Sequence, residues 1–216
     1  MNTEFARAKM IEQQVRAWDV LDKAVLDTLA STPREDFVPA AFRSLAFADV
    51  EVPIGHGESM MTPTVEGRVL QALELTPADR VLEVGTGSAY LTACMAKLGG
   101  SVVSVELHAD LLSAASDKLE EAGIGNVELE EMDAMRELPE GQFDAIAVTG
   151  SIQRFDPRFV ERLKPGGRLF VVVGDAPVMD ARRVRFDSEN DWFSESLFET
   201  TLKPLVHGAE PPQFAF

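Results

Sequence analysis

Apolar residues along this chain recur at two spacings, and the change from one to the other divides the sequence. Residues 4–30 have apolar side chains at helical spacing with a break at 19–22, which predicts two successive helices. Two prolines within residues 32–39 favour irregular or extended chain, and residues 40–47 predict a short helix. The start of the chain is therefore expected to be a helical extension that packs against the rest.

Short apolar runs of strand length begin at residue 81, and longer segments separate them. Alternation of this kind predicts an open α/β sheet. A helix over residues 64–73, with Thr62 or Thr64 as its N-cap, is expected to lead into the first strand. Pro165-Gly166-Gly167 predicts a turn before the fifth strand. The predicted strands are residues 81–84, 101–105, 127–130, 145–148 and 169–173.

The pattern changes once more after the fifth strand. Arginines alternate with apolar residues over 179–186, and residues 193–202 indicate a returning strand beyond a polar turn at 188–191. These runs predict a closing antiparallel hairpin, followed by a tail that is extended or docked through its phenylalanines. The expected fold class is a Rossmann-like, doubly wound α/β domain, with helices on both faces of a mostly parallel sheet. One domain is expected over 1–216, comprising an N-terminal helical extension and loop (1–63), a core (64–175) and a C-terminal hairpin and tail (176–216).

Composition adds limits to this picture. The chain has 216 residues, 45% hydrophobic and 26% charged, which is enough for a large core in one domain. Its net charge of −16 argues against a surface that wraps a polyanion, so no nucleic-acid partner is expected. The single cysteine, Cys94, is interpreted as a core residue, and three scattered histidines predict no metal site. Without an apolar leader or a membrane-length run, a cytoplasmic protein with no membrane partner is expected, as a monomer or homodimer.

The first predicted strand ends in Gly85-Thr86-Gly87, and a helix is predicted directly afterwards. Glycine permits the sharp turn and lets a ligand approach the backbone beyond the carboxyl ends of the strands. A dinucleotide fingerprint would have its third glycine where Tyr90 stands, which disfavours NAD and FAD. Glu83 would repel a pyrophosphate, but it suits a positively charged ligand such as S-adenosylmethionine (SAM), which carries a sulfonium and an ammonium group.

Acidic residues also follow the next two predicted strands. Glu106 lies about twenty residues after the glycine turn, where an acid can accept hydrogen bonds from ribose hydroxyls. Asp133 follows the third strand, where it could accept from an adenine amino group. Either acid alone is more typical of a solvated helix cap. Together with Glu83 and the glycine turn, at these spacings, they indicate a nucleoside-binding site.

These residues suggest a family. The chain resembles the protein-L-isoaspartate O-methyltransferases, within the class I SAM-dependent methyltransferases, over roughly residues 10–175. The resemblance implies SAM as cofactor, S-adenosyl-L-homocysteine as product, no metal, and methylation of the carboxylate of isoaspartyl residues in damaged proteins or peptides. The segments that carry it are residues 10–16, 33–39, 46–49, 53–55, 81–90, 143–149 and 163–169.

The resemblance also implies particular cofactor-binding residues. Positions that match the family motifs are Ser59, Gly85, Thr86, Gly87, Ser88, Glu106, Asp133 and Thr149. The candidate set is completed by Glu83, Tyr90, Leu107 and Ala134, which lie within or beside the same strand ends.

The loop at 55–63 departs from the family pattern. Met61 stands where the family has the serine that positions the substrate carboxylate, and Glu58 stands where it has glutamine. Ser59 and Thr62 are therefore the candidate catalytic residues, since either could supply the missing hydroxyl after a small shift of the loop. Two alternatives stay open: a related enzyme with the same SAM site and a different acceptor, and a non-catalytic SAM-binding protein.

Overall fold

The computed structural model describes residues 3–188 and 191–208. Its N-terminal part is the expected pair of helical segments. Asp19 ends the first segment in the left-handed region at φ 63°, and the Asp22 side chain caps the second by accepting from the Val25 N–H. The break predicted at 19–22 is confirmed. The helical elements here are α1 (Thr3–Met10), η1 (Ile11–Val15), η2 (Arg16–Trp18) and α2 (Lys23–Ser31).

The next segment differs in part from the expectation. A short helix, α3 (Arg34–Phe37), occupies chain that was predicted to be irregular. Pro33 precedes this helix and Pro39 follows it, and both positions tolerate proline, so neither residue prevents the helical turn. The helix predicted at 40–47 is the 3-10 helix η3 (Ala40–Leu45).

The glycine-rich segment predicted as a loop contains a small hairpin. Its strands, β1 (Val52–Gly55) and β2 (Glu58–Met60), pair antiparallel and form a sheet separate from the main one. Three successive residues of positive φ make the turn, Gly55 at 111°, His56 at 52° and Gly57 at 73°. Two of the three are glycines, which adopt this conformation without a steric penalty.

The main sheet has seven strands in the order β5-β4-β3-β6-β7-β8-β9, of which the first five are parallel and the last two antiparallel. Every predicted strand is confirmed, and most are longer than predicted. The Pro165–Gly167 turn falls inside the span of β7, at an irregularity in its pairing with β6. The strands are β3 (Arg80–Val84), β4 (Ser101–Glu106), β5 (Val127–Glu131), β6 (Phe143–Ile152), β7 (Leu163–Asp175), β8 (Val178–Ser188) and β9 (Asp191–Thr200).

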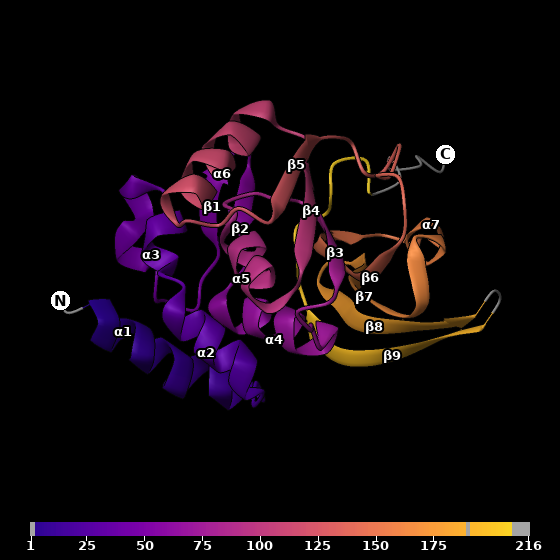
Figure 1. Ribbon diagram of the computed structural model, residues 1–216. Helices are drawn as coiled ribbons and strands as arrows, with labels where there is room; N and C mark the ends of the chain where they lie inside the picture. The colour runs from indigo at the N-terminus through magenta and orange to yellow at the C-terminus, as the bar shows by residue number, and fades with distance from the viewer. Residues whose placement is uncertain (1–2, 189–190, 209–216) are drawn as a thin grey trace, which may run out of the picture.

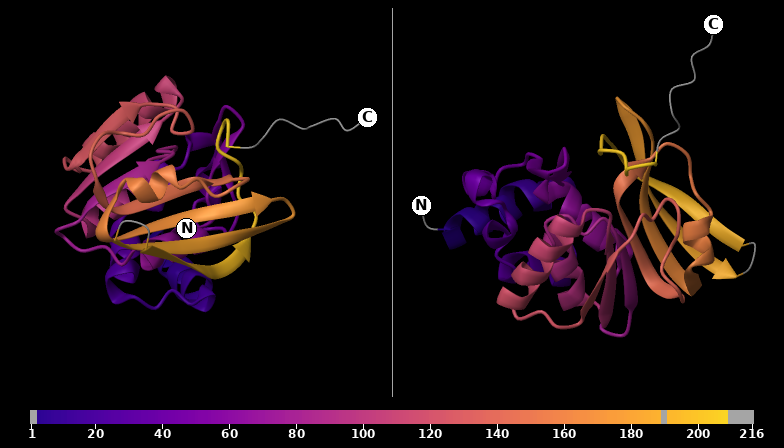
Figure 2. Two further views of the ribbon diagram at one scale, coloured as in Figure 1. Left: turned by 90° about the vertical axis from the view of Figure 1, so that its right-hand side faces the viewer. Right: turned by 90° about the horizontal axis from the view of Figure 1, so that it is seen from above.

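The helices cover the two faces of the sheet unequally. In Figure 1, α4 (Pro63–Leu73), α5 (Tyr90–Leu98) and α6 (Ala109–Glu121) lie on one side, and the four-residue α7 (Arg158–Glu161) lies on the other. The view from above in Figure 2 shows the same division, with the N-terminal helices stacked outside the first layer. Thr62, one of the two N-caps predicted, is the N-cap of α4.

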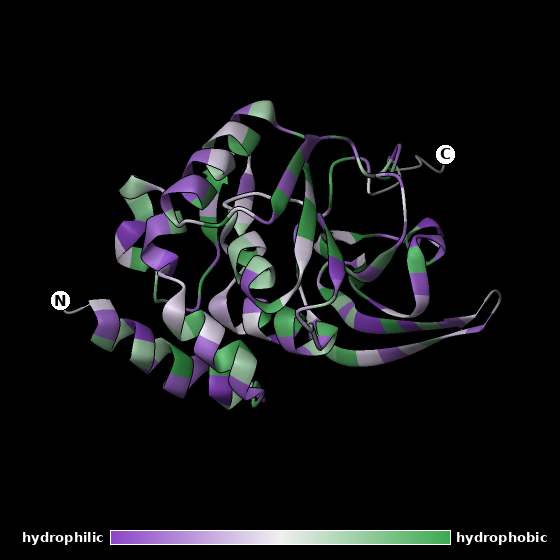
Figure 3. Cartoon of the chain, viewed as in Figure 1, coloured by the Kyte–Doolittle hydropathy of each residue, from purple (hydrophilic) through white to green (hydrophobic). Residues whose placement is uncertain are grey.

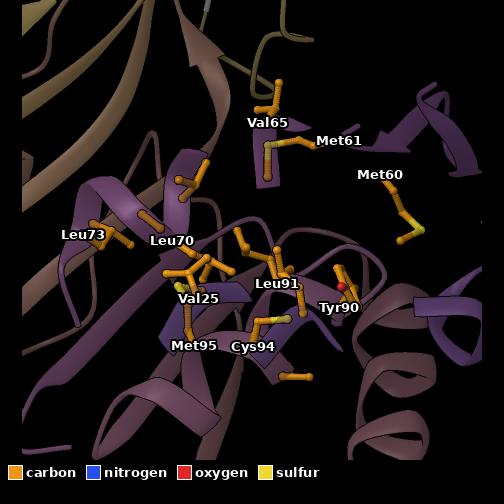
Figure 4. Packing of buried hydrophobic residues seen from close by; sticks show 14 of the residues in the cluster. Val25, Met60, Met61, Val65, Leu70, Leu73, Tyr90, Leu91, Cys94 and Met95 are labelled. Carbon is orange, nitrogen blue, oxygen red and sulfur yellow. The ribbon is translucent and has the colours of Figure 1, made fainter. Parts of the chain in front are cut away.

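The core forms one apolar layer on each face of the sheet. Neighbouring strand residues point in opposite directions, so Val81 packs in the layer with α4 and α5 while Leu82 packs in the other. Figure 3 shows α5 in pale to green colours, in keeping with a helix buried along nearly its whole length. Cys94 belongs to this layer (Figure 4). Its thiol is buried, as predicted, and burial raises its pKa to about 12.

The chain after β9 returns to the carboxyl end of the parallel strands. The Ser151 N–H donates to the Lys203 carbonyl at 2.8 Å, and the Leu205 N–H donates to the Ser151 carbonyl at 2.9 Å. Pro204 thereby forms a parallel bridge with Ser151, near the end of β6. The expectation for the tail concerns residues that lie almost wholly beyond 208, outside the described chain. None of the helices found in residues 3–188 and 191–208 combines the length and apolar character needed to cross a lipid bilayer.

Candidate functional site

The glycine turn after β3 is held by the strands on either side. The N–H groups of Gly85 and Thr86 donate to the Val105 carbonyl of β4 at 2.9 and 3.2 Å. From β6, Thr149 Oγ1 donates to the carbonyls of Val84 at 2.8 Å and Gly85 at 2.9 Å. Gly85 has a φ of 98°, and a Cβ there would lie 2.4 Å from Thr149 Oγ1, so this position requires glycine.

Glu106 at the end of β4 is bound to the same turn. Its Oε2 accepts from the Gly87 N–H at 2.9 Å, and its Oε1 accepts from the His108 N–H at 3.0 Å. The side chain is thus fixed in one orientation and nearly buried. Because each carboxylate oxygen has two lone pairs, each can still accept a hydrogen bond from a ligand hydroxyl.

Asp133, just beyond β5, already has hydrogen-bond partners within the chain. Its Oδ1 accepts from the Met135 N–H at 3.1 Å. Its Oδ2 lies 2.8 Å from His207 Nδ1 and 3.1 Å from Arg136 Nε. An amino group of a bound base would therefore share this carboxylate with His207.

Glu83 is the buried end of a hydroxyl network. Its Oε2 accepts from Thr92 Oγ1 and from Ser104 Oγ, each at 2.5 Å, and Thr86 Oγ1 lies 2.6 Å from Ser104 Oγ. Since Ser104 has a single proton and donates it to Glu83, Thr86 must donate to Ser104. Oε1 of Glu83 is buried with no partner in the described chain. Burial raises the pKa of Glu83 from an ordinary value near 4.5 to about 8, against the lowering effect of the two hydroxyls.

Two adjoining cavities bring most of the predicted residues together. We call the first the turn cavity, because it lies beside the glycine turn at the ends of β3 and β4. The predicted residues that line it are Ser59, Gly85, Gly87, Glu106, Leu107, Asp133, Ala134 and Thr149. We call the second the inner pocket; it adjoins the turn cavity and is also lined by residues of the β1–β2 hairpin. The predicted residues that line the inner pocket are Ser59, Glu83, Gly85, Thr86, Gly87, Ser88 and Thr149.

Two predicted residues line neither cavity. The Tyr90 ring is almost fully buried, packs edge-on against Phe37 and lies 5.5 Å from the Arg34 guanidinium carbon. It is the first residue of α5, and its side chain belongs to the buried cluster shown in Figure 4. The Thr62 hydroxyl caps α4 and lies 2.9 Å from the Thr64 hydroxyl. Both residues therefore support the walls of the site from outside it.

The β1–β2 hairpin carries the candidate hydroxyl. Ser59 Oγ donates to Glu51 Oε2 at 2.9 Å, and Ser59 lines the turn cavity, the inner pocket and a third, more open space. We call this space the outer groove; it lies between the hairpin and residues 175–179 and 201–204. Met61 lines only the inner pocket, beside Val65 (Figure 4), and its carbonyl accepts from Arg34 Nη2 at 2.8 Å.

Other lining residues were not predicted. His108 lies two positions after Glu106, so its closeness in sequence could have revealed it. Its ring stacks on His56 of the hairpin turn, with centroids 4.0 Å apart. Residues 202–206 also line the turn cavity, yet no local signal marks them, because they reach it only through the C-terminal hairpin. Within residues 3–188 and 191–208, no group of three or more histidine, cysteine, aspartate or glutamate side chains is positioned to hold a metal ion.

Five parallel strands with a glycine turn after the central one, an acid at the tip of the next, and two antiparallel strands at one edge define a Rossmann-like methyltransferase domain. A solved structure from Plasmodium falciparum has this fold. It is described as a protein-L-isoaspartate O-methyltransferase in complex with S-adenosyl-L-homocysteine, and its TM-score is 0.81 at 22% identity, with 93% of this chain and 98% of that chain covered.

The sequence comparisons identify the family within this class. The model of the family described as Protein-L-isoaspartate(D-aspartate) O-methyltransferase (PCMT) matches residues 6–209, and this chain belongs to that family. Protein-L-isoaspartate O-methyltransferase 2 of Pelobacter propionicus is 38% identical over 97% of this chain and 93% of its own length. Protein-L-isoaspartate O-methyltransferase 1 of Rhodopseudomonas palustris is 36% identical over 94% of this chain and 85% of its own length.

Proposed function

We propose that this protein transfers the methyl group of SAM to the carboxylate of isoaspartyl residues in proteins or peptides. The chain belongs to a family of such methyltransferases, and the arrangement of four features in its cavities supports the proposal. Glu83, the turn at 85–87 and Glu106 follow one another along joined cavities, and Ser59 lies where these cavities meet the outer groove. A methyl donor bound along Glu83, the glycine turn and Glu106 would lie next to an acceptor that enters through the outer groove.

The side chains present fit SAM. Oε1 of Glu83 is a buried acceptor without a partner in the described chain, and it suits the ammonium group of the cofactor. The remaining lone pairs of Glu106 suit ribose hydroxyls, and the apolar side chains of Leu107, Leu111 and Met132 suit an adenine ring. When bound, SAM supplies a methyl group activated by its positively charged sulfur.

Orientation is the main task left to the protein. A carboxylate acceptor is already ionised near pH 7, because its unperturbed pKa is about 4, so no general base is needed. Holding the reacting groups in line and excluding water can contribute roughly 7–11 kcal/mol. Ser59 Oγ is the hydroxyl nearest this task, since it lines all three spaces and could turn from Glu51 to an acceptor carboxylate. Met61 has no hydroxyl, and that of Thr62 is occupied at the start of α4.

A second candidate function is methylation of a different acceptor. Met61 replaces the family's hydroxyl, and Glu58 adds negative charge to the groove, which together favour a more apolar or cationic acceptor.

A non-catalytic SAM-binding protein is the third possibility. Tight binding of SAM without methyl transfer to any peptide, small molecule or extract tested would favour that third reading.

The decisive experiment measures incorporation of labelled methyl groups into an isoaspartyl peptide and into its aspartyl twin. Incorporation into the isoaspartyl peptide alone is expected. No incorporation at high enzyme concentration, despite SAM binding measured by calorimetry, would contradict the proposed acceptor. The Met61→Ser variant in the same assay should be more active, because it restores a hydroxyl in the inner pocket; unchanged activity would show that Ser59 suffices.

Three further expectations form part of this proposal. They are a single domain over 1–216, a cytoplasmic location without nucleic-acid or membrane partners, and a monomeric or homodimeric state. Limited proteolysis would test the first, since a single domain should yield no stable fragment that ends between 63 and 176. Light scattering on the purified protein would decide the oligomeric state.

A further inference from the structure

Almost all of the charged side chains that line the site proposed to receive an anion are acids. Across the described linings of the turn cavity, the inner pocket and the outer groove, Lys203 is the only lysine or arginine. A carboxylate acceptor that enters such surroundings meets repulsion unless a cation offsets it. The acidic lining residues are Glu51, Glu58, Glu66, Glu83, Glu106, Asp133 and Asp175.

Lys203 lies where the turn cavity and the outer groove meet. It lines both the turn cavity and the outer groove, together with Ser59. Its backbone is anchored to the end of β6, because its carbonyl accepts from the Ser151 N–H at 2.8 Å. Its side chain extends from there to the β1–β2 hairpin, where the ammonium group meets Gly57 and Glu58.

The present partners of this ammonium group come from the hairpin. Lys203 Nζ donates to the Gly57 carbonyl and lies 3.3 Å from Glu58 Oε1. A Cβ at Gly57 would be 3.1 Å from Nζ, so glycine leaves the room that this contact needs. The Lys203 and Glu58 side chains are 39% and 25% exposed, so the ion pair faces the groove and can exchange partners.

We propose that Lys203 binds the acceptor carboxylate, and that Glu58 is the counter-ion it leaves when the acceptor enters. This inference rests on the proposed function and adds a residue that determines acceptor specificity. In the free protein the Glu58 carboxylate neutralises the ammonium group; in the complex the acceptor carboxylate does so, between Lys203 and Ser59. Glu58 then competes with the acceptor, and the pair admits anions where the rest of the lining repels them.

A purely structural clamp between the hairpin and the C-terminal segment would behave differently. If the ion pair only held the hairpin closed, loss of either partner would weaken the site in the same way. If Lys203 binds the acceptor, the two partners have opposite effects. The comparison of Lys203→Met with Glu58→Gln therefore separates the two roles, and Lys203→Arg tests whether charge alone restores binding.

The test uses the full-length protein saturated with S-adenosyl-L-homocysteine and titrated with an isoaspartyl peptide. Lys203→Met should weaken peptide binding about tenfold or more, since it removes a hydrogen bond to a charged group, and Lys203→Arg should recover most of the loss. Glu58→Gln should strengthen binding several-fold, because the competing charge is gone. Thermal unfolding followed by circular dichroism should show one cooperative transition in all three variants, which shows that they fold.

The outcomes separate this inference from the proposed function. Methylation by the wild type, with peptide binding that is equal in Lys203→Met, would overturn the role of Lys203 alone. Weakened peptide binding in Glu58→Gln would also overturn the role of Lys203, and it would indicate that the ion pair only holds the hairpin closed. Peptide binding that depends on Lys203, without any methyl transfer, would contradict the proposed function alone. A peptide that is neither bound nor methylated would overturn both.

Discussion

The Thr92 hydroxyl donates to one carboxylate oxygen of Glu83, and the other oxygen of that carboxylate has no partner in the described chain. Glu83 therefore lies in the core with part of its hydrogen-bonding capacity unused, beside the glycine turn. Its raised pKa of about 8 means that it is largely protonated at neutral pH in the absence of a ligand. Cofactor binding and proton binding should then be coupled at this residue.

We expect SAM binding at pH 7 to release close to one proton. The ammonium group of the cofactor favours the ionised form of Glu83, so the carboxyl group loses its proton when the complex forms. Titration calorimetry in buffers of different ionisation enthalpy measures this number. The Glu83→Gln variant should bind SAM more weakly and release no proton. A binding heat independent of the buffer in the wild type would contradict the prediction.

The same residue should make the cofactor-free protein less stable as the pH rises. The folded pKa of Glu83, about 8, exceeds the unfolded value near 4.5, so between these pH values the folded state binds more protons than the unfolded state. The free energy of unfolding then falls with pH, by up to about 1.4 kcal/mol per pH unit. Urea unfolding at pH 5.5, 6.5 and 7.5 should show Glu83→Gln gaining stability over the wild type as pH rises. A constant difference between the two would show that Glu83 does not titrate in this range.

Arg34 and Glu66 form a buried ion pair behind the site. Arg34 Nε lies 2.9 Å from Glu66 Oε2, with the two side chains 0% and 3% exposed. Arg34→Met should lower the free energy of unfolding by about 3–5 kcal/mol, because it leaves the Glu66 carboxylate buried without its counter-ion. Lys23→Met is the matched control, since Lys23 is 86% exposed and its loss should cost less than about 1 kcal/mol.

The double variant Arg34→Met/Glu66→Leu should recover part of this stability, because it buries no charge. It should not recover all of it, since the carbonyls of Ala46 and Met61 also lose a donor when Arg34 is replaced. Denaturant unfolding of the three variants makes the comparison. Equal losses in Arg34→Met and Lys23→Met would show that the buried pair contributes little.

Ser59 and Thr62, the two hydroxyls considered for catalysis, should respond differently to removal. Ser59→Ala should lower kcat about a hundredfold with little change in stability, if its hydroxyl orients the acceptor. Thr62→Ala should instead lower stability by about 1 kcal/mol through loss of the α4 N-cap. Methyl-transfer kinetics and thermal unfolding on both variants distinguish the roles. A large kcat loss confined to Thr62→Ala would reverse the assignment.

The strands and the glycine turn could be predicted because their causes are local. The run at 81–84 is apolar except for Glu83, which is typical of a strand buried on both faces, and Gly85 fits a φ that other residues rarely adopt. Glu106 and Asp133 could be placed at one edge because parallel strands end together. The helix α3 was not predicted, because prolines usually interrupt helices. Here Pro33 lies just before the helix and Pro39 lies just after it, and both positions tolerate proline.

The amino-acid sequence by itself determined the sheet, the glycine turn and the acids beside it, since these depend on residues close together in the chain. Only the tertiary structure decided that Tyr90 points into the core, that Glu83 keeps one oxygen unpaired, and that Lys203 meets the hairpin turn at Gly57, 146 residues earlier. The first two depend on how α3, α5 and β4 pack around these side chains, and the third depends on how the C-terminal segment packs against the end of β6. Neither is encoded in the spacing of nearby residues.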